Sequence, residues 1–259
     1  MLKKLMKYEF KATGRLMLPL YGALIGLALI NKIFIGFNIE QTNMDFAGGV
    51  PSILALIAYI GTMAAVFICA LFITIQRFYK NLFGDEGYLM NTLPVRPYQN
   101  IIAKLLVSMA WFILSGIVAM ISIVIMAFYP EMIKDVLRCF SEVPAAFGEV
   151  GIDILGIVEF VILGIIWLAH EIMTFYASIS IGQMCKSNKI LGSFGAFLLI
   201  NFIEQVILFI GCFVVFNVGN FENVSANNTF LGGIVAGVGL FALLFFVTNY
   251  ILNNKLNLE

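Results

Sequence analysis

The fold of this chain is decided by residues 52–106, which read SILALIAYIGTMAAVFICALFITIQ (52–76) and then RFYKNLFGDEGYLMNTLPVRPYQNIIAKLL (77–106). The first part holds no charged side chain. As a helix rising 1.5 Å per residue, it is long enough to cross a hydrocarbon core of about 30 Å. The second part carries positive charge, two glycines and two prolines. The sequence therefore predicts a membrane-spanning helix that leads into a structured polar segment at the membrane surface.

The rest of the chain repeats the apolar pattern. Of its 259 residues, 61% are hydrophobic and 12% are charged, whereas globular domains carry about 25% charged residues. Six apolar runs are each long enough to span a bilayer, and we place them at 16–37, 52–76, 102–128, 154–184, 190–216 and 231–252. The sequence predicts an all-α integral membrane protein that forms a single domain over 1–259. A net charge of zero argues against a nucleic-acid partner.

The distribution of lysine and arginine predicts the orientation of the helices, because cytoplasmic loops collect positive residues. With both termini inside, the exterior side holds only Lys134 and Arg138. The cytoplasmic side then holds Lys3, Lys4, Lys7, Lys11, Arg15, Arg77, Lys80, Arg96, Lys104, Lys186, Lys189 and Lys255. We therefore expect an N-in/C-in multi-pass protein of the cell membrane.

The first fifteen residues have an amphipathic pattern. Leu2, Leu5, Met6 and Phe10 fall near one helical face, and lysines occupy the opposite one. This pattern is typical of a helix that lies along the membrane surface before the chain enters the bilayer. The alternative is a plain positively charged flank of the first span.

Five polar residues lie inside the predicted fourth and fifth spans, where ionisable groups are costly and usually face a bundle interior or a water-filled cavity. They are Glu159, His170, Glu171, Asn201 and Glu204. Glu159 and His170 are eleven residues apart, about three helical turns, so both project from nearly the same face. One interpretation is a polar translocation path or a set of proton-linked groups. The other is hydrogen bonding between helices.

No enzymatic site is predicted. His170–Thr174 reads H-E-I-M-T, but a zinc protease needs a second histidine at the position of Thr174 to complete the metal site. His170 is the only histidine in the chain. We expect no metal and no cofactor bound by this chain. Gly233 and Gly237 form a G-x-x-x-G pair that permits close helix packing, a pattern common in membrane bundles.

The polar segment 77–101 is predicted to form a short helix at the cytoplasmic surface. Gly84 and Gly87 bracket Asp85 and Glu86, whose carboxylates favour a helix N-terminus. Pro94 and Pro97 end this helix before the next span begins. A short helix with one apolar face suits docking into a groove on another protein. The alternative is an interfacial helix that contacts only lipid headgroups.

The motifs of this segment resemble those of the membrane subunits of ATP-binding-cassette (ABC) exporters, of the type-2 permease class, in a Gram-positive-like branch. The match is E-G-x-x-x-x-x-L-P-V at Glu86–Val95, followed by K-L-L at Lys104–Leu106. K-Y-E-F-K-A-T-G-R (Lys7–Arg15) and S-I-S-I-G-Q (Ser178–Gln183) are also similar to that branch. Taken with the six spans, the resemblance covers essentially the full chain.

The resemblance implies a permease without its own ATPase domain. A separate cytoplasmic ABC ATPase, which would bind ATP and Mg²⁺, docks beneath the segment between spans two and three. A second permease chain, identical or related, completes the transporter. The residues implied in coupling to the ATPase are Asp85, Glu86, Gly87, Tyr88, Leu89, Met90, Leu93 and Pro94.

Two other classes of function remain open from the sequence. An ion-coupled secondary transporter would use Glu159, Glu171 and Glu204, although the six spans show no evident inverted repeat or paired broken helices of the kind such transporters carry. A membrane scaffold or sensor would transport nothing. The substrate is not determined by any motif in the spans.

Overall fold

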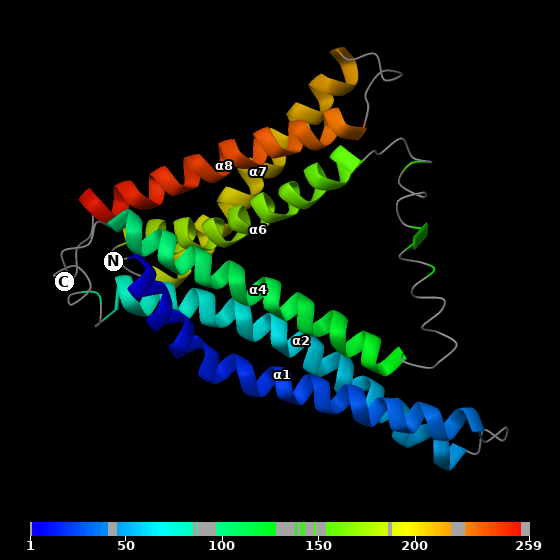
Figure 1. The fold of residues 1–259 in the computed structure, drawn as a ribbon. Coiled ribbons are helices and arrows are strands. Elements are labelled where there is room, and N and C mark those ends of the chain that lie inside the picture. The colour runs from blue at the N-terminus through cyan, green and yellow to red at the C-terminus, as the bar shows by residue number, and fades with distance from the viewer. Residues whose placement is uncertain are drawn as a thin grey trace. The chain divides into compact units, whose positions relative to one another are not determined.

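The computed structural model of the chain describes residues 2–40, 46–84, 87, 97–127, 138, 141–142, 148, 154–185, 188–218 and 226–254. Six long helices account for nearly all of them: α1 (Leu2–Glu40), α2 (Phe46–Leu82), α4 (Pro97–Ala127), α6 (Ile154–Gly182), α7 (Lys189–Val218) and α8 (Ala226–Asn254) (Figure 1). Each of the six is long and apolar enough to cross a membrane. The prediction of an all-helical, multi-pass membrane protein is confirmed.

Most of the helices extend beyond the apolar runs that predicted them, and two of these differences bear on the N-terminal and cytoplasmic segments. Helix α1 runs without interruption from Leu2 to Glu40 and contains Pro19, so residues 2–15 are its first turns and not a separate element. Their position along the membrane surface stays a prediction. Helix α4 begins at Pro97, five residues before the apolar run that we expected to open it, because proline is well suited to the first position of a helix.

The chain divides into two compact units, and the boundaries between them fall within α2 and α4. The first unit comprises Met1–Thr74 and Leu106–Phe140, and the second comprises Ile75–Leu105 and Ser141–Glu259. The first unit therefore holds α1 and most of α2 and α4. The second holds α6, α7 and α8 with the last turns of α2 and the first turns of α4.

The first unit is a three-helix bundle with an apolar core. Its most deeply buried members are Met17, Leu24 and Ala28 of α1 and Val66 of α2, and Trp111 of α4 packs with them. The buried side chains lie along one face of each helix, as expected for helices that pack against one another through a single apolar face.

Polar side chains connect the three helices of this bundle. Asn31 of α1 donates to the carbonyl of Ala55 on α2 at 3.0 Å. The hydroxyl of Tyr59 on α2 lies 2.8 Å from that of Ser122 on α4. The hydroxyl of Tyr21 on α1 lies 2.9 Å from that of Ser115, two turns earlier on α4. Such bonds hold helices together in lipid, where apolar burial alone does not favour one helix neighbour over a lipid tail.

The second unit is organised around α6, which packs against both α7 and α8. Its C-terminal half supplies most of the buried side chains, and Met173 and Tyr176 are fully buried there. The ring of Phe78, at the end of α2, stacks on Tyr176 with centroids 3.9 Å apart. This half of α6 is therefore the core of the unit.

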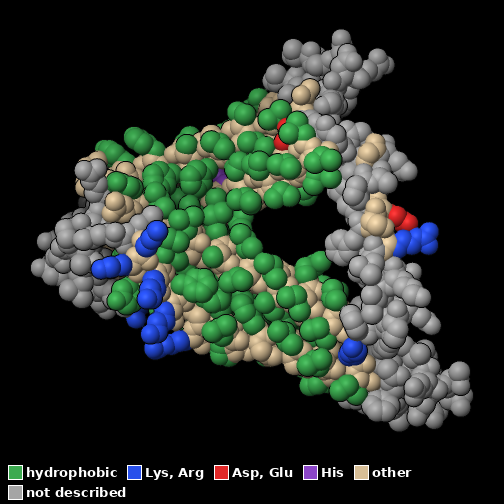
Figure 2. All heavy atoms as spheres, viewed as in Figure 1, with side chains coloured by type: hydrophobic (Ala, Val, Ile, Leu, Met, Phe, Trp, Pro, Cys, Tyr) green, Lys and Arg blue, Asp and Glu red, His purple; other side chains and the backbone are tan. Residues whose placement is uncertain are grey.

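The outward faces of the helices are strongly apolar (Figure 2). Ile190 on α7 is 81% exposed, and many other large apolar side chains on the described helices are also exposed. Such a surface would cause aggregation in water but is suited to contact with lipid chains. The apolar exposure thus agrees with the membrane assignment.

Candidate functional site

A buried pair of ionisable residues lies between α6 and α7 of the second unit. Nε2 of His170 on α6 is 3.3 Å from Oε2 of Glu204 on α7, and the two side chains are 1% and 13% exposed. The contact does not have hydrogen-bond geometry: Nδ1 and Nε2 of His170 and Oε1 of Glu204 have no hydrogen-bond partner among the described residues. Both residues lie near the middle of their helices. The pair is therefore an under-satisfied polar site at membrane depth.

The imidazole packs against Trp167 on its own helix, and Trp167 in turn lies against α8. The indole of Trp167, one turn earlier on α6, meets the His170 ring edge-on with centroids 5.3 Å apart. Gly237 of α8 makes room for this arrangement, because a Cβ atom there would lie 3.5 Å from the indole nitrogen and 2.9 Å from Ile166. Sequence reasoning noted Gly237 as a close-packing residue but did not connect it with Trp167 or His170.

The other three polar residues expected at this site are placed differently. Glu159 is buried, and its Oε2 has no hydrogen-bond partner within the described part of the chain. Glu171 is exposed. Asn201 donates to the carbonyl of Phe197 on its own helix at 2.9 Å. The structure thus brings His170 and Glu204 together, buries Glu159, and leaves Glu171 and Asn201 apart from the pair.

The chemistry available to this pair is proton or cation binding. An imidazole beside a carboxylate can share one proton, and unsatisfied polar atoms in a low-dielectric interior favour any group that satisfies them. Among the described residues there is no group of three or more His, Cys, Asp or Glu side chains that could hold a metal ion. The described geometry is thus a close imidazole–carboxylate pair with unsatisfied polar atoms.

The segment expected to couple to an ATPase is described only at its entry. Helix α2 ends in a turn in which the amides of Phe83 and Gly84 both donate to the carbonyl of Tyr79, the second bond being the 6→1 type found at helix C-termini. The amide of Gly87 then donates to the carbonyl of Gly84 at 2.8 Å. The predicted contacts at Asp85, Glu86, Tyr88, Leu89, Met90, Leu93 and Pro94 lie outside the described residues.

The end of α6, which carries the S-I-S-I-G-Q motif, packs tightly against the start of α7. Ser178 and Ser180 are buried, and each donates to the carbonyl four residues earlier. A Cβ atom on Gly182 would overlap the backbone and hydroxyl of Ser193 on α7. Only glycine allows the two helices to approach so closely here. The resemblance points to this motif, but no pattern in the sequence indicates that Ser193 is the residue it contacts.

Comparison with known proteins identifies no relative: no family model matches the sequence, and neither a curated protein nor a solved structure is matched by this chain.

Proposed function

We propose that this chain is the membrane-spanning subunit of an ATP-driven ABC transporter, most simply an exporter, in which a separate ATPase supplies the energy. The observation that carries the proposal is the motif order Glu86-Gly87 and Leu93-Pro94-Val95 between α2 and α4, followed by Lys104-Leu105-Leu106 in the first turns of α4. The turn at Gly84 and Gly87 supports it, because it ends α2 immediately before this motif. The six apolar helices provide the membrane part that such a subunit requires.

In this proposal the segment between α2 and α4 transmits force. The ATPase binds the segment through Asp85, Glu86 and Tyr88 as polar contacts and through the apolar side chains of Leu89, Met90 and Leu93. Both helices that flank the segment span the boundary between the two units. A displacement of the segment would therefore act on both units through continuous helices. Two such chains and two ATPase subunits would form the transporter in the cell membrane.

The proposal is tested by co-purification of the full-length chain with a co-expressed ABC ATPase, for which any ATPase encoded next to its gene is the first candidate. We expect Glu86→Lys and Leu93→Asp each to abolish the association, because one reverses a charge and the other places a charge in an apolar contact. Asn188→Lys and Asn188→Asp are the matched controls, since Asn188 is exposed in the α6–α7 turn. Full ATPase binding by both segment variants would overturn the docking assignment.

A second candidate function rests on the buried His170–Glu204 pair. An ion-coupled transporter would use it, with Glu159, to carry protons. In proteoliposomes such a protein would move substrate along a pH gradient in the absence of ATP, and Glu204→Gln would stop that movement. Transport that requires ATP and survives Glu204→Gln would exclude this alternative.

A further inference from the structure

A groove in the first unit lies between α1 and α4, away from the residues used in the proposed function. It has a volume of about 450 Å³ and is lined by Phe10, Lys11, Gly14, Arg15, Leu18, Tyr21, Trp111, Leu114 and Val118. None of these residues is acidic. The surface of the groove itself is almost entirely apolar. The charges nearest to it are positive, because Lys11 and Arg15 stand at its rim.

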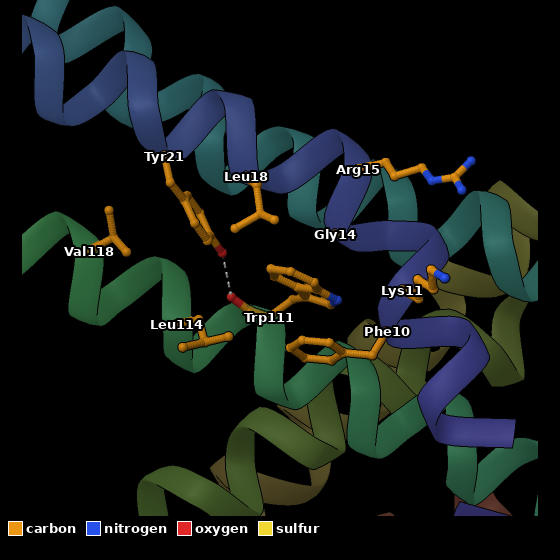
Figure 3. Close-up of a pocket in the computed structure, with 9 residues that line it drawn as sticks. All are labelled: Phe10, Lys11, Gly14, Arg15, Leu18, Tyr21, Trp111, Leu114 and Val118. Carbon is orange, nitrogen blue, oxygen red and sulfur yellow. Dashed lines mark hydrogen bonds between the residues drawn. The ribbon is translucent and has the colours of Figure 1, made fainter. Parts of the chain in front are cut away.

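The charged and apolar residues are separated along the groove. Lys11 and Arg15 lie towards the N-terminal end of α1, whereas Leu18, Leu114 and Val118 lie further along α1 and α4 (Figure 3). In that view both cationic groups point away from the Trp111 ring. The helix rises about 15 Å between Lys11 and Tyr21. Apolar chains therefore fit the groove, and a ligand that also has an anionic end can meet Lys11 and Arg15 at the rim.

The walls of the groove are fixed before any ligand binds. The rings of Phe10 and Trp111 stack with centroids 4.5 Å apart, and the indole nitrogen of Trp111 donates to Thr13 at 2.6 Å. The hydroxyl of Tyr21 donates to the carbonyl of Trp111 at 3.2 Å (Figure 3). A preformed site of this kind orders few groups on binding and so keeps more of its interaction energy as affinity.

The positive charge extends beyond the groove along the same helix. Lys3, Lys7, Lys11 and Arg15 are spaced four residues apart and are all exposed. A second, smaller groove of about 370 Å³ on the other side of Phe10 is lined by Lys3, Lys7 and apolar residues of α1 and α4. Figure 2 shows lysine and arginine side chains gathered at the end of the first unit where α1 begins. Glu9, the one acidic residue in this stretch of α1, is buried.

We propose that the α1–α4 groove binds an anionic phospholipid, with its phosphate against Lys11 and Arg15 and its acyl chains along Leu18, Leu114 and Val118. The groove opens on helices that are long and apolar enough to cross the bilayer, so lipid is the available source of such a molecule. Basic pockets between membrane helices are suited to anionic headgroups. Neither the docking of an ATPase nor transport is needed for this inference.

Trp111 provides a direct probe of occupancy. The chain has two tryptophans, so the variant Trp167→Phe leaves Trp111 as the only indole. Full-length protein of this variant, in detergent, is titrated with phosphatidylglycerol or phosphatidylcholine carrying brominated acyl chains, which quench a nearby indole. We expect phosphatidylglycerol to quench Trp111 at a concentration about tenfold lower than phosphatidylcholine does, because only its headgroup carries a net negative charge that Lys11 and Arg15 attract. Phosphatidylglycerol should also raise the thermal stability of the wild-type protein more than phosphatidylcholine does. This comparison checks that Trp167→Phe has not altered the site.

The double variant Lys11→Gln/Arg15→Gln is expected to lose this preference while its quenching by phosphatidylcholine stays unchanged. The charge-matched control is Lys4→Gln/Lys189→Gln, which removes two exposed cations that do not line the groove and should retain the preference. Equal quenching of Trp111 by the two lipids would show a nonspecific lipid contact and overturn the proposal. Retention of the preference by Lys11→Gln/Arg15→Gln would also overturn it, and this variant's unchanged helicity would exclude misfolding.

Discussion

The indole nitrogen of Trp111 on α4 donates a hydrogen bond of 2.6 Å to the hydroxyl of Thr13 on α1, 98 residues earlier in the chain. Thr13 in turn donates to the carbonyl of Glu9 at 2.8 Å. Both side chains are buried. This relay links the start of α1 to α4, on the same part of the bundle that forms the proposed lipid groove.

Replacing Thr13 with valine should therefore destabilise the protein. Valine keeps the shape of threonine but leaves the Trp111 N–H buried without an acceptor, which costs about 1–3 kcal/mol. Hydrogen bonds between membrane helices contribute less, about 0.6 kcal/mol on average. We expect a loss of about 1 kcal/mol in the free energy of unfolding, measured by denaturation in detergent. Thr13→Ser, which restores the hydroxyl, should recover most of it. Thr62→Val, at a hydroxyl that bonds the carbonyl four residues earlier on its own helix, should have a smaller effect. Equal losses for Thr13→Val and Thr62→Val would contradict the relay.

Gly182 is predicted to tolerate no side chain. Alanine there would overlap the backbone of Ser193, so the start of α7 must move, at a cost of about 1–3 kcal/mol or more for an overpacked site. Gly195→Ala on α7 is the control, because a Cβ atom at Gly195 meets nothing within 4 Å and alanine favours the helix. Thermal unfolding of the two variants, followed by circular dichroism, should give a lower midpoint for Gly182→Ala only. Equal unfolding midpoints for the two variants would mean that the start of α7 can move away from residue 182 with no loss of stability.

Gly237 should be sensitive to substitution where Gly239 is not. A Cβ atom at Gly237 would lie 2.9 Å from Ile166 and 3.5 Å from the Trp167 indole, whereas one at Gly239 has no neighbour within 4 Å. Gly237→Val is expected to lower the free energy of unfolding by about 1–3 kcal/mol, and Gly239→Val to leave it nearly unchanged. Urea or detergent denaturation of the purified variants provides the comparison. A larger loss of stability for Gly239→Val than for Gly237→Val would contradict the packing of α8 against α6 through Gly237.

His170 and Glu204 should behave as a coupled pair. Replacing either residue removes the polar neighbour of the other buried side chain. The effects of His170→Gln and Glu204→Gln on the free energy of unfolding should therefore not add. For residues in contact, the coupling energy from a double-mutant cycle is about 0.5–3 kcal/mol. Glu171→Gln is the control, since Glu171 is adjacent in sequence to His170 but exposed, and its cycle with Glu204→Gln should show no coupling. Additive effects in the first cycle would mean that the 3.3 Å approach carries no energy.

The helices themselves followed from the sequence with little ambiguity. An apolar run such as residues 52–76 must satisfy its backbone hydrogen bonds internally in lipid, and a helix is the simplest way to do so. Boundaries were less certain, because propensity and charge vary gradually at the membrane surface. The amphipathic pattern of residues 2–15 predicts a surface helix, and the structure shows these residues as the first turns of α1.

At the candidate site, the sequence does not predict which face of α6 points into the bundle. His170 and Glu171 are neighbours in the chain and were both expected to face the bundle interior, but successive residues of a helix differ by about 100° in direction. His170 is buried and Glu171 is exposed. A single ionisable residue does not fix the rotation of its helix. The rotation is set by the packing of Trp167 and Gly237 and by the close approach of Gly182 to Ser193.

The sequence by itself determined the number and membrane character of the helices, because these depend on local length and hydropathy. The tertiary structure alone decided which polar groups meet: Thr13 with Trp111, Tyr21 with Ser115, and His170 with Glu204. These pairs depend on the rotation and axial position of each helix against its neighbours. In lipid, rotation and axial position are selected by shape and by interhelical hydrogen bonds over long sequence separations, and apolar composition carries almost no information about them.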